Sequence, residues 1–128
     1  MPEVTPLTGE LQTQIMSALW RLGGGTVEQV RGALPPRYRG AYNTVQTVLN
    51  RLAERGLLSR HKAGNAIEYR SVLSEAEYLS RSISQTLAAA SMDARRAALA
   101  RLIGGLDKAE LADLQQLASE LGDKRRKR

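Results

Sequence analysis

The segment 43–47 is rich in uncharged side chains that donate and accept hydrogen bonds, namely Asn43, Thr44, Gln46 and Thr47. Amide and hydroxyl groups can match the donors and acceptors that base edges present in the major groove of DNA. An ordinary solvated helix face is a weaker interpretation, because Thr is a poor helix former. We therefore expect these four residues to read bases.

Basic side chains flank this segment on both sides. Phosphates are bound by Lys, Arg and other donors, which fix the register of a protein on DNA without reading its sequence. The loop 35–40 and the segment 60–70 supply most of these groups. We expect contacts with the DNA backbone from Arg37, Arg39, Tyr42, Asn50, Arg51, Arg60, Lys62 and Arg70.

The elements that must position these residues follow from hydrophobic periodicity and breakers. Apolar residues three and four positions apart predict helices over 7–22, 26–34 and 41–55, with glycines and prolines between them. Segment 60–70 predicts a β-hairpin with a turn at 63–65. Three helices followed by a basic hairpin is the order of a winged helix-turn-helix, whose third helix enters the major groove.

The second half of the chain predicts three further helices, over 74–90, 92–103 and 107–121. Their apolar stripes are too narrow to close a core within one chain, so we expect them to pair two copies. The predicted fold is mainly α with a small β-hairpin. Its domains are a DNA-binding domain at 1–73, a helical dimerisation domain at 74–121 and a basic, disordered tail at 122–128. The expected interface residues are Leu79, Ile83, Leu87, Leu99, Leu102, Ile103, Leu111, Leu114 and Leu121.

Charge and composition exclude several other classes of protein. The 128 residues carry a net charge of +6, with nine basic and five acidic side chains in 1–72 but five and eight in 73–123. With no cysteine and a single histidine, His61, we expect no metal and no cofactor. No carboxylate cluster or nucleophile–base pair indicates an enzyme. No apolar run reaches the roughly 20 residues of a membrane span, so we expect a cytoplasmic protein.

The residues of the third helix resemble a known family. Ala41-Tyr42-Asn43-Thr44-Val45-Gln46-Thr47-Val48-Leu49-Asn50-Arg51-Leu52, with Leu19-Trp20 before and Gly56-Leu57-Leu58 after, closely resemble the penicillinase repressor family of BlaI, MecI and CopY-like proteins. The resemblance covers nearly all of 6–121. It implies a homodimeric winged-helix transcriptional repressor that binds double-stranded DNA at a palindromic operator with TACA/TGTA-like half-sites. It also implies control of β-lactam-resistance or related genes and release by a sensor-linked protease.

Three departures from the family pattern limit what is carried over. The absence of cysteine excludes copper sensing through a C-terminal cysteine motif. Gln46 replaces a residue that is typically basic, which changes the expected base preference from guanine toward adenine. Ala100-Arg101-Leu102 lacks the cleaved Asn–Phe pair of relatives. Two alternatives stay open: a nucleoid-type protein that binds DNA through charge alone, and a winged-helix adaptor that binds protein.

Overall fold

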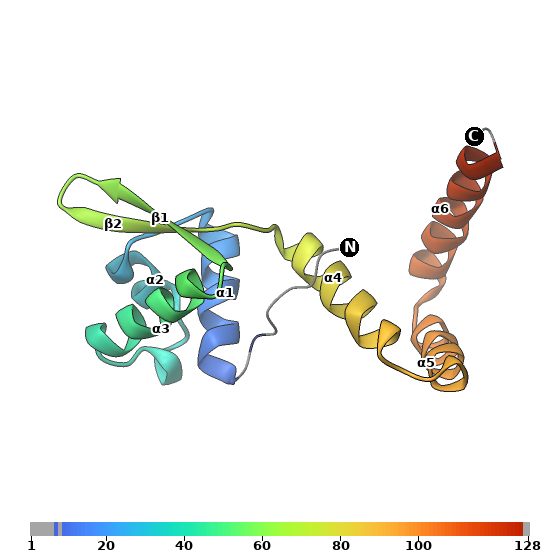
Figure 1. Ribbon diagram of the computed structural model, residues 1–128, viewed down its shortest axis with the longest axis horizontal. Coiled ribbons are helices and arrows are strands. Elements are labelled where there is room, and N and C mark those ends of the chain that lie inside the picture. Colours follow the sequence, from blue (N-terminus) through green and yellow to red (C-terminus); the bar gives the residue numbers. More distant parts are fainter. Residues whose placement is uncertain (1–6, 8, 127–128) are drawn as a thin grey trace. The chain divides into compact units, whose positions relative to one another are not determined.

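The computed structural model describes residue 7 and residues 9–126, which form helices and one β-hairpin (Figure 1). This agrees with the mainly α fold that the sequence predicts. The elements in chain order are α1 (Glu10–Leu22), α2 (Val27–Ala33), the 3-10 turn η1 (Pro36–Tyr38), α3 (Tyr42–Glu54), β1 (Leu58–Ala63), β2 (Ala66–Ser71), α4 (Glu75–Ala88), α5 (Met92–Gly104) and α6 (Lys108–Arg126).

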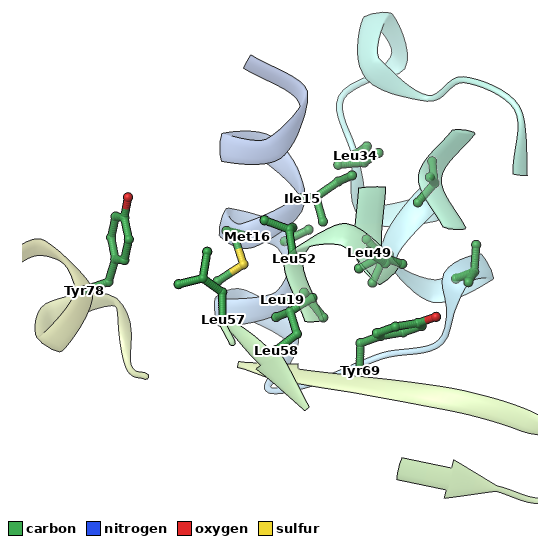
Figure 2. Close-up of a cluster of buried hydrophobic side chains, with 14 residues drawn as sticks. Ile15, Met16, Leu19, Leu34, Leu49, Leu52, Leu57, Leu58, Tyr69 and Tyr78 are labelled. Carbon is green, nitrogen blue, oxygen red and sulfur yellow. The ribbon is translucent and has the colours of Figure 1, made fainter. Parts of the chain in front are cut away.

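The hydrophobic core lies where α1, α2 and α3 meet the hairpin (Figures 1 and 2). Ile15 and Leu19 of α1, with Leu49 and Leu52 of α3, are all 0–1% exposed. Tyr69 enters the same cluster from β2. Because one face of α3 is buried in this core, the opposite face of the helix is turned toward solvent.

Capping residues set the ends of the short helices. Gly23 ends α1 in the left-handed conformation, with φ of 76°, which glycine adopts without steric cost. Thr26 and Gln29 form a capping box at the start of α2, with N···O distances of 3.3 and 2.9 Å. The hairpin is joined to this region because the backbones of Gly25 and Tyr69 exchange two hydrogen bonds.

The chain divides into two compact units, residues 1–85 and 86–128, and the division falls inside α4. In the first unit Tyr78 of α4 packs against Trp20, with ring centroids 5.7 Å apart. Its hydroxyl accepts a hydrogen bond of 2.8 Å from the backbone N–H of Leu7. In the second unit no described side chain of α5 or α6 is buried.

The last helix extends further than the sequence indicates. The sequence predicts a disordered tail at 122–128, whereas α6 continues through Arg126. Arg126 pairs with Asp123 one turn earlier, and basic residues in a last helical turn interact favourably with the helix dipole. Lys127 and Arg128 lie outside the described residues.

Candidate nucleic-acid interface

Helix α3 has one buried face and one hydrogen-bonding face. Val45, Leu49 and Leu52 are fully buried, which turns the opposite face of the helix outward. All four predicted base-reading residues lie on α3: Asn43, Thr44 and Thr47 are exposed, and Gln46 is half-buried. The structure therefore brings the predicted hydrogen-bonding groups together on one helix.

Thr47 is partly committed within the helix. Its hydroxyl donates a hydrogen bond of 2.8 Å to the backbone carbonyl of Asn43. With that proton engaged, Thr47 offers neighbouring molecules an acceptor oxygen and a methyl group. A methyl group can contact thymine C5, so this geometry favours a different role for Thr47 than for the amide side chains.

The hairpin contacts α3 through Asn50. Arg60 of β1 donates from Nε to Asn50 Oδ1 at 3.2 Å and from Nη2 to the Asn50 backbone carbonyl at 3.2 Å. The hydroxyl of Tyr69 donates to the same Oδ1 at 2.7 Å. Arg60 is thus held beside the exposed face of α3, although its side chain remains accessible to solvent.

The register of the hairpin separates its basic residues. Arg60 is opposite Tyr69 and Lys62 is opposite Ile67, so these residues share the face that meets α3. Arg70 is opposite Ser59 and therefore lies on the other face. The structure brings Arg60 and Lys62 together and leaves Arg70 apart from them.

Arg70 has contacts of its own on that other face. Its Nε is 2.6 Å from Glu68 Oε1, in an ion pair along the strand. A Cβ built on Gly24 would stand 3.1 Å from Arg70 Cγ, and Gly24 has a φ of 133° that only glycine adopts readily. This close packing gives Arg70 a place in the fold near the end of α1.

The two predicted arginines of the loop differ in their surroundings. Arg39 donates to the backbone carbonyls of Leu34 and Gly32, at 2.9 and 3.2 Å, and so closes the C-terminal end of α2. Arg37 is 73% exposed and lies 3.3 Å from Glu10. Its guanidinium lies 4.7 Å from the ring centroid of Tyr38.

Glu10 is a residue that the sequence analysis missed. Its carboxylate accepts a 2.5 Å hydrogen bond from the Tyr38 hydroxyl, which raises the pKa of Tyr38. The same carboxylate pairs with Arg37 and so reduces the net positive charge of the loop. A glutamate at the start of a helix carries no local sequence signal that its partners are Arg37 and Tyr38, 27 and 28 residues later.

Tyr42 and Arg51 complete the predicted backbone-contacting set. Tyr42 begins α3 and is 42% exposed, and Arg51 is exposed near the other end of the helix. Together with Lys62 they extend a polar and basic surface along α3 and the adjoining hairpin face. No group of three His, Asp or Glu side chains within the described residues could hold a metal ion.

The comparisons with known proteins agree with this geometry. The family model described as "Penicillinase repressor" matches residues 8–120. The transcriptional regulator BlaI of Mycobacterium tuberculosis (strain CDC 1551 / Oshkosh) is 34% identical over 123 residues, which are 94% of this chain and 88% of the relative. The chain belongs to the penicillinase repressor family. It is a DNA-binding transcriptional repressor and not an enzyme.

Solved structures of relatives identify the fold of the first unit. The solution structure of the DNA-binding domain of the repressor BlaI has a TM-score of 0.51 and 25% identity, and the match covers 60% of this chain and 94% of that one. Bacillus licheniformis BlaI, solved as a monomeric form in complex with the blaP half-operator, has a TM-score of 0.50 with the same identity and coverage. These matches confirm the predicted winged helix-turn-helix.

None of the helices in the described part of the chain combines the length and apolarity needed to cross a bilayer.

Proposed function

We propose that this repressor binds a palindromic operator as a homodimer, with α3 of each copy in a major groove. The observation that carries the proposal is the two-sided character of α3. Val45, Leu49 and Leu52 are fully buried, whereas Asn43, Thr44 and Thr47 are exposed and Gln46 is half-buried beside them. These groups would read base edges, and the half-sites would be TACA/TGTA-like with a change at the position that Gln46 meets.

The phosphate contacts would come from the surface around α3. Lys62, Arg51 and Tyr42 are exposed there, and Arg60 is held against Asn50 at the edge of the helix. The structure of B. licheniformis BlaI with the blaP half-operator supports such a complex, since its fold matches the first unit. Arg39 and Arg70 have partners within the fold, so we assign them to loop and hairpin structure first and to DNA second.

The homodimer would form through α4, α5 and α6. These helices leave large apolar side chains accessible, and a soluble protein usually buries such stripes against a partner. Two copies could cover a standard interface of roughly 1,600 Å². The residues proposed for it are Leu79, Ile83, Leu87, Leu99, Leu102, Ile103, Leu111, Leu114 and Leu121, of which Leu87 and Leu111 are half-buried and the rest exposed.

The regulated genes and the release step are also part of the proposal. The match to the family described as "Penicillinase repressor" favours β-lactam-resistance or related genes as targets. The family resemblance implies a sensor-linked protease as one trigger. Such a protease would act by separating the two copies, because each winged helix alone makes few base contacts. Release would then need no change in the residues that contact DNA.

Selection of bound duplexes from a random DNA pool tests the proposed function. The full-length protein should enrich an inverted repeat whose half-site centres are about one helical turn, ~10 base pairs, or a multiple of it apart. A recovered pool with no shared motif would favour the alternative of binding through charge alone. Failure to recover any DNA at low salt would instead favour a winged helix that binds protein.

A further inference from the structure

The side-chain amide of Asn50 lies where α3 meets both strands of the hairpin. Its Oδ1 accepts one hydrogen bond from the Tyr69 hydroxyl at 2.7 Å and another from Arg60 Nε at 3.2 Å. A second nitrogen of Arg60 donates to the Asn50 backbone carbonyl at 3.2 Å. One residue of the helix is therefore bonded to a neighbouring pair of residues on β1 and β2.

Tyr69 supplies the fixed end of this arrangement. Tyr69 is 2% exposed, and its ring lies within the core cluster shown in Figure 2. Its backbone N–H and carbonyl are bonded to Gly25 at 2.8 and 3.0 Å. Because both its backbone and its ring are held, the hydroxyl can define the position of the Asn50 side chain.

The register of the hairpin transmits that position to its basic residues. Arg60 is directly opposite Tyr69, and Lys62 is two residues further along the same face. The bonds at Asn50 therefore join this face of the hairpin directly to α3. A hairpin held in this way carries Arg60 and Lys62 at a set distance from the base-reading face of α3.

We propose that Tyr69 and Asn50 are positioning residues for operator binding, which fix the hairpin relative to α3 so that phosphate and base contacts form in the same register. This inference rests on the proposed function. Tyr69 is buried, so it raises affinity without touching DNA. Removing the Asn50 oxygen would leave the buried Tyr69 hydroxyl without its acceptor, which is costly in a protein interior.

The test is Tyr69→Phe, which removes the hydroxyl and keeps the ring. The probe is the duplex that the wild-type protein selects from a random pool. Affinity should fall by about threefold to tenfold, the range of one hydrogen bond. The base preference should stay unchanged, because no base contact is deleted, and the salt slope should become shallower by no more than it does in Lys62→Ala.

Tyr78→Phe is the matched control. It also removes a hydroxyl from a largely buried tyrosine in the same unit, whose partner is the backbone of Leu7 and not α3. Affinity should match that of the wild type. Equal losses in the two variants would indicate general destabilisation and would overturn the inference.

A double-mutant cycle with Lys62→Ala provides a readout that a merely structural role would not move. If Tyr69 acts by placing the hairpin, its removal should cost less affinity once Lys62 no longer contacts phosphate. Strict additivity, or a Tyr69→Phe protein that binds like the wild type, would overturn the inference. A wild-type protein that selects no motif would instead overturn the proposed function.

Discussion

Gln46 differs from Asn43, Thr44 and Thr47 because it is half-buried, whereas those three are exposed. At that position a bidentate amide could meet adenine, whereas a basic side chain would prefer guanine. Gln46→Ala should therefore weaken binding to the selected duplex by about 1–3 kcal/mol and relax the preference at one base pair. Binding to duplexes changed at single positions measures this.

The control for Gln46 is Gln115→Ala, which shortens an exposed glutamine on α6. It should leave the preference at every position intact. If Gln46→Ala also left the preference unchanged, Gln46 would not face a base and α3 would be oriented differently on DNA.

Lys62, in contrast to Gln46, is expected to act on DNA through its charge alone. If Lys62 makes one phosphate contact, its loss should weaken binding to all DNA sequences alike. The plot of log affinity against log salt should also become shallower by about one. Titrations at several salt concentrations give this slope for Lys62→Ala and for Lys108→Ala, an exposed lysine that begins α6. A slope for Lys62→Ala equal to that of the wild type would remove Lys62 from the interface.

At the scale of elements, α4 begins with a reciprocal pair between Ser74 and Glu77. Ser74 N–H donates to Glu77 Oε1 at 3.2 Å, and Glu77 N–H donates to the Ser74 hydroxyl at 3.1 Å. The bonds from the backbone and then the hydroxyl of Ser74 lower the pKa of Glu77. The charged carboxylate is therefore favoured in the folded protein.

The sign of this pKa shift predicts a pH dependence of stability. Glu77 contributes fully to folding stability above the pKa that it has in the unfolded chain. This contribution is lost as the pH falls through its lower pKa in the folded protein. Wild-type protein should be more stable than Glu77→Gln near neutral pH, and the two should converge on acidification. Urea unfolding across this range measures the difference. A gap independent of pH would contradict it, and Glu75→Gln separates the charge of the first turn from the capping pair.

The elements could be read from the sequence, but the bonds of their side chains could not. Periodicity, glycines and prolines predict the positions of α1 to α3 and the hairpin, since these are local signals. Charge alone predicts phosphate contacts for Arg39 and Arg70, whereas within the fold Arg39 bonds a helix-end carbonyl and Arg70 a neighbouring glutamate. Alternation along the hairpin was the available signal for Arg70, because Arg70 and Lys62 fall on opposite faces once the turn is set. Nothing local indicated that Tyr69 would reach Asn50.

For the whole molecule, the proposed dimer makes operator affinity depend on the helices that join the two copies. Joining two binding units makes the second contact intramolecular, which typically gains a factor of about 10²–10⁴. The double variant Leu102→Glu, Leu114→Glu should be monomeric by light scattering and should lose operator affinity by a factor in this range. Gln115→Glu adds a charge beside Leu114 at a polar position and should remain dimeric.

Truncation after Ala100 tests whether loss of the dimer is sufficient to release the protein from DNA. It removes part of α5 and all of α6 and leaves the first unit complete. Affinity at physiological salt should fall with the loss of the dimer. Binding within about threefold of the intact protein would contradict release through dimer separation and would direct attention to a trigger that acts on 1–73.

The most direct test of the central claim is a ratio of two affinities at physiological salt. The wild-type protein is titrated with its selected duplex and with a scrambled duplex of the same length and composition. If α3 reads bases, the selected duplex should bind tighter by about 10³ or more. A ratio near one, with an equally steep salt dependence for both duplexes, would show binding through charge alone and would contradict the account.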